Sequence, residues 1–301
     1  MILCVTPAPA LDRTAHADGD QRGVDTHQLR DIFVVPAGGG TNVAHLLSLA
    51  GQETMTVVPA PRISQYMRMV GMLGLPCDVV EVAGPIPVHF KVSFPNGAHL
   101  EFRDPPMPLD AAQLAILREH AVSHAERATW MVLAGELPAV ANTGWFVDVM
   151  RATQLYHPHT KIAVATAGPA LSAVLRQVFT TKPHVIALDK GNVDIDLSTE
   201  EIVATLVDAG VDHILLCEDR RHFQLYSSGT QMSAEFVADE SDGRLPWIDA
   251  ALAGLLLADP YQDPAAALRY ALAYANSAGG TESGHVPTPD SLALAQVKMQ
   301  S

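Results

Sequence analysis

Two aspartates and one run of glycines are the residues of this chain whose types and positions could do chemistry. Asp249 opens an apolar helical stretch, and Asp12 follows the first strand-like run, where a carboxylate can hydrogen-bond the hydroxyl groups of a sugar. Gly38 to Gly40 stand directly before another helical stretch. Glycine allows a positive φ and a close approach of the backbone to a ligand, and a helix N-terminus favours an anion.

Each of these features also has a purely structural explanation. Aspartate is a favoured N-cap, a lone aspartate after a strand often forms a turn, and three glycines can form a tight turn. The glycine run lacks the Lys-Ser/Thr of a P-loop and the G-x-G-x-x-G spacing of a dinucleotide-binding fold. The thirteen histidines show no metal-ligand spacing, so we predict no metal site built from the protein's own side chains.

The elements that must position these residues alternate along the chain. Short, continuous runs rich in Val, Ile and Leu are typical of buried parallel strands, and they occur at 2–6, 54–58, 77–82, 129–134, 161–165, 184–188 and 213–217. Helical patterns lie between most of them, at 41–51, 64–73, 110–125, 142–153, 168–179 and 198–210, with caps expected at Thr41, Ser64, Asp110, Asn142 and Ser198. The alternation predicts an α/β fold with a mostly parallel sheet flanked by helices.

Two segments break this alternation. The stretches 12–36 and 87–103 have the pattern of antiparallel ribbons, the second with a hairpin turn at Asn96-Gly97. We predict that they form a small β-sheet lid over the carboxyl ends of the main strands, where ligands bind in open α/β sheets. Further helices are expected at 248–258, 263–277 and 289–298, and a single domain is expected to span 1–301.

The bulk composition excludes several classes of protein. Hydrophobic residues make up 48% of the chain and charged residues 17%, which is typical of a globular protein. The net charge of −14 disfavours nucleic acid, whose phosphates would be repelled. No apolar run is long enough to span a bilayer and no signal peptide precedes the first strand, so we expect no membrane partner and a cytoplasmic location. Three widely spaced cysteines fit a reducing compartment.

Five stretches carry a resemblance to a known family. They are TPAPALD (6–12), PAGGGTNVAHLLSLAG (36–51), LEFRDPPMPLD (100–110), VLAGELP (132–138) and DAALAGLLLA (249–258). In this order, and over nearly the whole length, they resemble the motifs of the PfkB branch of the ribokinase family of carbohydrate kinases. The group with the most similar motifs is that of 1-phosphofructokinase and tagatose-6-phosphate kinase.

The resemblance implies a ribokinase-like fold with a small β-sheet lid and a homodimer that forms through the lid. It also implies transfer of the γ-phosphoryl group of ATP, with Mg²⁺, to a hydroxymethyl group of a sugar or sugar phosphate. By position, Asp249 is the catalytic base. The residues that the resemblance assigns to sugar binding are Asp12, Gly38, Gly39 and Asn42.

The chain departs from the family pattern at the anion hole. Where the family has G-A-G before the base, this chain has Pro246, Trp247 and Ile248. Proline has no N–H to donate, and a β-branched isoleucine resists a positive φ. We expect the indole of Trp247 to pack over the start of the helix and to occupy part of the phosphate site; the alternative is that it packs into the core.

Three further motifs differ. The family's K-P-N-x-x-E falls on 187–192, with Ala187 and Asn192 at the Lys and Glu positions. Its nucleotide loop falls on CEDRRH (217–222), which puts two acidic residues where a polyphosphate would pass. Its sugar-phosphate pattern in the lid falls on 85–90, which contains no arginine.

Two functions therefore remain open. One is a sugar or sugar-phosphate kinase that uses ATP and Mg²⁺ at an altered nucleotide site. The other is a non-catalytic relative that binds a small sugar-like ligand or a protein partner and needs no cofactor. A dinucleotide-dependent oxidoreductase is a third and weaker alternative, because the glycine spacing is wrong for it.

Overall fold

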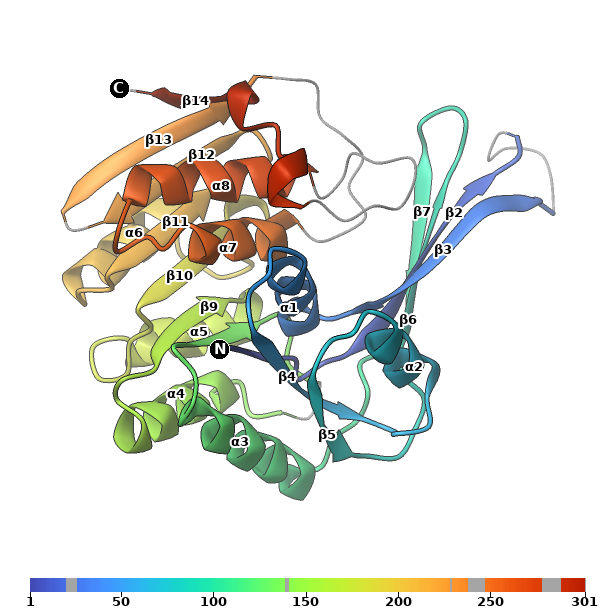
Figure 1. Ribbon diagram of the computed structural model, residues 1–301, viewed down its shortest axis with the longest axis horizontal. Helices are drawn as coiled ribbons and strands as arrows, with labels where there is room; N and C mark the ends of the chain where they lie inside the picture. Colours follow the sequence, from blue (N-terminus) through green and yellow to red (C-terminus); the bar gives the residue numbers. More distant parts are fainter. Residues whose placement is uncertain (20–25, 139–140, 228, 238–246, 278–287, 301) are drawn as a thin grey trace.

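A ten-stranded sheet with helices on both faces forms the body of the molecule (Figure 1). The structure is a computed structural model that describes residues 1–19, 26–138, 141–227, 229–237, 247–277 and 288–300. The parallel part of this main sheet contains β1 (Ile2–Val5), β4 (Thr54–Ala60), β5 (Cys77–Glu81), β8 (Trp130–Ala134), β9 (Lys161–Ala165), β10 (Val185–Asp189) and β11 (His213–Cys217). At one edge it continues through the antiparallel strands β12 (His222–Ser227), β13 (Thr230–Phe236) and β14 (Val297–Gln300). The strand order is β14-β13-β12-β11-β10-β9-β8-β1-β4-β5.

Alternate residues of the central strands contribute to two separate apolar cores, one on each face of the main sheet. In β1, Ile2 and Cys4 belong to one core, and Leu3 and Val5 belong to the other. The first face is covered by α1 (Gly39–Leu49), α7 (Trp247–Leu257) and α8 (Pro264–Ser277), and the second by α3 (Ala111–Ala125), α4 (Trp145–Tyr156), α5 (Gly168–Gln177) and α6 (Thr199–Asp208). Burial on both faces explains the continuously apolar strand sequences, and the predicted α/β architecture is confirmed.

A separate four-stranded sheet, which we call the small sheet, projects from one side of the body (Figure 1). It consists of β3 (Leu29–Ala37), β2 (Ala10–Ala17), β6 (Val88–Ser93) and β7 (His99–Arg103), in that order. The outer pairs are antiparallel, whereas β2 and β6 are parallel. Helix α2 (Gln65–Met72) lies beside β3 and links the small sheet to the body. The two segments with a ribbon pattern thus combine into one sheet.

Several helix ends follow the capping pattern of the sequence. Asp110 and Gln113 form a reciprocal capping box at the start of α3, and Ser198 and Glu201 form another at the start of α6. The side chain of Ser64 accepts a hydrogen bond from the backbone N–H of Met67. These side chains satisfy backbone N–H groups that a helix start leaves without partners.

Two predicted caps and one predicted helix are wrong. Helix α1 begins two residues before Thr41, whose hydroxyl bonds to Thr6 and Tyr66 instead, and α4 begins after Gly144 rather than after Asn142. The segment 289–298 contains two 3₁₀ turns, η2 (Pro289–Ser291) and η3 (Leu294–Gln296), and then β14. Its last residues pair with β13, so the gain from completing a sheet edge outweighs the local helical pattern.

Within the described part of the chain, no helix is both long enough and apolar enough to cross a membrane.

Candidate ligand-binding cavity between the two sheets

A cavity of about 590 Å³ lies between the small sheet and the carboxyl ends of the main parallel strands. The small sheet contributes Asp12, His89 and Arg103 to its wall, and the starts of α1 and α7 contribute Gly38, Gly39, Asn42, Ile248 and Asp249. The loops that follow β8, β9 and β10 complete it. This is the position where parallel α/β sheets bind ligands, because connecting loops diverge there and helix N-termini point inwards.

Asp249 lies in the first turn of α7 and is 4% exposed. Its Oδ2 accepts a hydrogen bond from Nδ2 of Asn42 at 2.9 Å, which joins α1 to α7 across 207 positions of sequence. Burial raises the pKa of Asp249 to about 6, the Asn42 hydrogen bond opposes this effect, and the Asp12 carboxylate adds to it. A carboxylate with a pKa close to neutrality, held by an amide, is suited to accept a proton from a hydroxyl group.

Asn42 has a second polar atom that the described protein does not satisfy. The residue is 2% exposed, and its Oδ1 has no hydrogen-bond donor among the described residues. A buried acceptor without a donor is unfavourable, by about 1–3 kcal/mol in typical proteins. Asn42 lines the cavity, but its Oδ1 is itself shielded from the cavity by the surrounding protein.

The glycines at the start of α1 are required by close packing as well as by the cavity. Gly38 has a φ of 116°, and a Cβ at this position would lie 2.4 Å from Cγ2 of Thr6. A Cβ on Gly39 would lie 2.5 Å from the carbonyl carbon of Ala134 and from the backbone nitrogen of Gly135. The structural explanation of the glycine run is therefore sufficient by itself, and both glycines nevertheless line the cavity.

Three polar side chains form a row across the small sheet. Asp12 lies opposite His89, and His89 lies opposite Arg103, so all three project from the face that the cavity uses. Nδ1 of His89 donates to Oδ1 of Asp12 at 3.1 Å. Two carboxylates flank the guanidinium of Arg103, since its Nε is 3.3 Å from Glu101 and its Nη1 is 3.3 Å from Glu136 on the main body.

The sequence did not indicate His89, Arg103 or Glu136, and the hairpin register explains why. A two-residue turn at Asn96-Gly97 would place His89 opposite residue 104. The structure instead closes the ladder at Ser93 and His99, with a five-residue loop in which Gly97 has a φ of 81°. A one-residue change in register moves every side chain of the strand to the other face, so only the longer loop brings Arg103 to the cavity.

The residues of the altered anion hole are only partly described. Pro246 lies outside the described residues. Trp247 and Ile248 form the first turn of α7, and neither has a positive φ. The Trp247 ring lies 5.9 Å from that of Phe223 and packs against the core under α7, whereas Ile248 lines the cavity. The indole therefore packs against the core, and Trp247 is not among the described residues that line the cavity.

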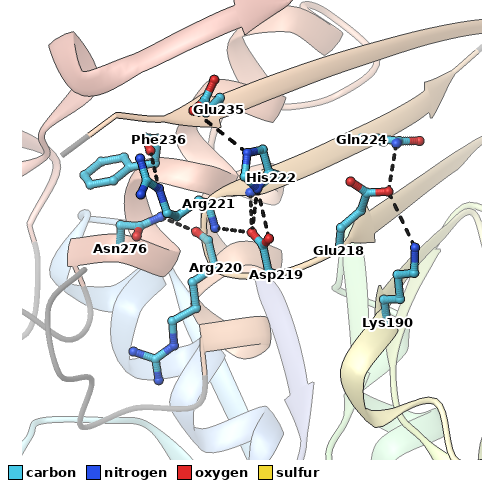
Figure 2. A network of polar contacts seen from close by, with 10 residues as sticks. All are labelled: Lys190, Glu218, Asp219, Arg220, Arg221, His222, Gln224, Glu235, Phe236 and Asn276. Atoms are coloured by element: carbon cyan, nitrogen blue, oxygen red, sulfur yellow. Dashed lines mark hydrogen bonds and ion pairs between the residues drawn. The ribbon is translucent and has the colours of Figure 1, made fainter. Parts of the chain in front are cut away.

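The loop between β11 and β12, where the resemblance expects a nucleotide, is closed on itself (Figure 2). The carboxylate of Asp219 accepts hydrogen bonds from the backbone N–H of Arg221 at 2.7 Å and of His222 at 2.8 Å, and from the His222 ring at 2.9 Å. These bonds hold the pKa of Asp219 below its ordinary value, against the effect of burial. The side chain thus occupies two backbone donors of its own loop.

Neighbouring contacts hold the same loop in place. Nε of Arg221 donates to the Phe236 carbonyl at 3.0 Å, and the Asn276 amide donates to the Arg220 carbonyl at 2.6 Å (Figure 2). At the end of β10, Asp189 lines the cavity and its carboxylate accepts the backbone N–H of Gly191 at 3.0 Å. Burial raises the pKa of Asp189, and this hydrogen bond opposes the rise.

Comparison with solved structures shows which fold positions this cavity. A possible 1-phosphofructokinase from Thermotoga maritima aligns over 100% of this chain and 99% of its own, with a TM-score of 0.85 and 16% identity. Phosphofructokinase-2 from Escherichia coli in complex with potassium aligns over 96% of each chain, with a TM-score of 0.81 and 17% identity. The same enzyme in complex with fructose-6-phosphate aligns over 92% of this chain and 93% of its own, with a TM-score of 0.78 and 17% identity. Neither a protein-family model nor a curated protein sequence matches the chain.

The chain therefore has the ribokinase-like fold of the PfkB sugar kinases over its full length, as the motif resemblance predicts. At this level of identity the comparison establishes the fold alone, and the chemistry has to be argued from the site.

Proposed function

We propose that this chain is a homologue of the PfkB carbohydrate kinases that binds a sugar or sugar phosphate in the cavity and does not transfer a phosphoryl group from ATP. The observation that carries the proposal is the contrast between the two halves of the site. The half beneath the small sheet is an open cavity with polar groups, whereas Asp219 occupies the donors of the loop expected to hold the nucleotide.

The cavity suits a ligand with several hydroxyl groups. Asp12 and Asp249 reach it from the small sheet and α7, and each carries carboxylate oxygens that can accept a hydrogen bond. Hydroxyl groups donate to such acceptors and can accept from Arg103. Gly38 and Gly39 line the cavity with backbone atoms alone.

ATP and Mg²⁺, the cofactors that the family resemblance implies, do not fit the described nucleotide loop. A polyphosphate would meet the carboxylates of Glu218 and Asp219, and it would have to displace Asp219 from two backbone N–H groups. Lys190 offers little compensation, because its Nζ lies 3.8 Å from a Glu218 oxygen. Trp247 and Ile248 also form a helical turn where the family has a glycine loop.

Substitution of Asp12 tests the sugar-binding half of the proposal. Asp12→Ala removes a charged acceptor from the cavity and should weaken binding of a sugar by about 1–3 kcal/mol. Asp18→Ala is the matched control, since Asp18 pairs with Arg30 outside the cavity. Thermal shift and calorimetry with fructose, tagatose and their phosphate esters provide the measurement. Equal affinities for Asp12→Ala and the unmodified protein would refute the assignment of Asp12.

Phosphoryl transfer from ATP to a hydroxymethyl group is the second candidate, and Asp249 is the observation that favours it. Its burial, its raised pKa and its bond to Asn42 are properties that a general base needs. ATP-dependent phosphorylation of a sugar or sugar phosphate by the unmodified protein, lost in Asp249→Asn, would establish this second function.

We also propose a homodimer formed through the small sheet. Along β7, Leu100 and Phe102 alternate with Arg103, so they point away from the cavity, and they are 38% and 57% exposed. An open sheet with apolar side chains on its outer face is stabilised when a second copy covers it.

The three cysteines are free, which is consistent with the proposed cytoplasmic location.

A further inference from the structure

We propose that the cavity selects a sugar or polyol without a phosphate group and disfavours its phosphate ester. This inference rests on the proposed function, because it names the class of ligand for the same cavity. The ligand class that we infer differs from the ligand in one of the structures compared above, phosphofructokinase-2 in complex with fructose-6-phosphate.

Charge is the first observation. Of the described residues that line the cavity, five are carboxylic acids: Asp12, Glu136, Asp189, Asp194 and Asp249. The same described lining contains one guanidinium, that of Arg103, and one imidazole, that of His89. With the acids ionised and the imidazole neutral, these groups carry a formal charge of −4. A phosphate ester would bring a further negative charge into this field, and the repulsion is stronger in a partly enclosed cavity than in water.

The two basic groups of the wall already have anionic partners. Arg103 lies 3.3 Å from Glu101 and 3.3 Å from Glu136, and His89 donates to Asp12 at 3.1 Å. A phosphate that bound Arg103 would have to share its guanidinium with two carboxylates that are built into the protein. The segment 85–90, which leads into the small sheet, has no arginine that could replace it.

The third observation is the excess of hydrogen-bond acceptors at the floor of the cavity. Asp12 and Asp249 line the cavity with carboxylates, which accept hydrogen bonds and donate none when they are ionised. Sugar hydroxyl groups can donate to both, whereas an ionised phosphate offers acceptors almost exclusively. The floor and the charge of the wall therefore favour the same class of ligand.

Matched pairs of ligands test the inference. Fructose, tagatose, ribose and glucose are each titrated against their 6-phosphate or 5-phosphate ester by calorimetry, with the unmodified protein. For any sugar that binds, we expect the affinity of the ester to be lower by a factor of about ten or more. This difference in affinity should shrink at high salt because screening weakens the repulsion. An ester that binds more tightly than its free sugar would overturn the inference while leaving the proposed sugar-binding function intact. If neither member of any pair binds, the proposed function fails, and the inference falls with it.

A charge-removing variant tests the cause. Glu136→Gln removes one wall carboxylate and frees a side of Arg103, so the ratio of ester to sugar affinity should rise about threefold or more. Glu81→Gln is the matched control, because Glu81 also pairs with an arginine on the surface, Arg62 at 3.0 Å, but does not line the cavity. An equal ratio in Glu136→Gln and Glu81→Gln would contradict the electrostatic explanation.

Discussion

Asp249 is a buried carboxylate whose position suits function better than stability. It is 4% exposed, and burial raises its pKa to about 6. The folded protein therefore holds its proton more tightly than the unfolded chain does, and the contribution of this group to the free energy of unfolding falls as the pH rises from about 4 to about 6. Such a residue persists in a core where its chemistry is used, or where a partner such as Asn42 compensates in part.

Because the pKa of Asp249 is raised, its ionised form should destabilise the folded protein at neutral pH. Asp249→Asn keeps an acceptor for Asn42 and removes the ionisation, so at pH 7 the variant should be more stable than the unmodified protein by about 2–3 kcal/mol. At pH 4, where the native carboxyl is protonated, the two proteins should be nearly equal. Urea denaturation at both pH values measures the difference.

The control for this prediction is Asp148→Asn. Asp148 also lies in the first turn of a helix, α4, but it is only partly buried and pairs with Arg151 at 3.4 Å. Its replacement should change stability by less than about 1 kcal/mol and in the destabilising direction, because an acid favours a helix N-terminus. A destabilised Asp249→Asn variant at pH 7 would show that the ionised carboxylate is held by groups other than Asn42.

At the scale of elements, the glycines of α1 fix how closely this helix approaches the main sheet. Gly39→Ala should destabilise the protein by about 1–3 kcal/mol, because its Cβ would lie 2.5 Å from backbone atoms that cannot move independently. Gly71→Ala is the contrasting variant, since Gly71 lies in α2, where an added Cβ would point into open space. It should stabilise the protein by about 0.5–1 kcal/mol. Equal effects of the two substitutions in thermal unfolding would contradict the packing account.

The sequence allowed the elements to be predicted better than their register. Apolar runs at 2–6 and 213–217 predicted strands, because burial on both faces of the sheet leaves a pattern in the local sequence. The capping box at Ser198 likewise predicted the start of a helix. Placement of Arg103 depended on a loop longer than the Asn96-Gly97 pattern indicates, and the fate of 289–298 depended on pairing with β13. Both are set by tertiary contacts that the local sequence does not contain.

Asp249 and Asn42 illustrate the same limit for the site. The motif resemblance assigned both residues to one proposed site, and in the structure Nδ2 of Asn42 lies 2.9 Å from Oδ2 of Asp249. Their protonation and the unsatisfied Oδ1 of Asn42 depend on burial, which the sequence does not show. Likewise, acidic residues at 217–222 were visible in the sequence, but the bonds that Asp219 makes within its own loop were not.

At the scale of the whole molecule, the small sheet is expected to mediate association of two chains. Phe102→Asp places a charge on its outer face and should convert a dimer into a monomer of about 32.1 kDa, as measured by light scattering. Leu155→Asp is the control, because Leu155 is 71% exposed on α4, away from the small sheet, and should leave the mass unchanged. A clean monomer mass for the unmodified protein would contradict the proposed dimer.

Under the proposed function, the molecule retains the sugar half of a kinase site and has lost the nucleotide half. Calorimetric titration of the unmodified protein with ATP and Mg²⁺ tests it most directly. We expect no measurable heat and no change in melting temperature, because the Asp219 carboxylate occupies the loop donors and a ligand that does not bind the native state cannot stabilise it. Saturable heat with ATP and Mg²⁺, accompanied by a rise in melting temperature, would contradict the claim and favour an active kinase.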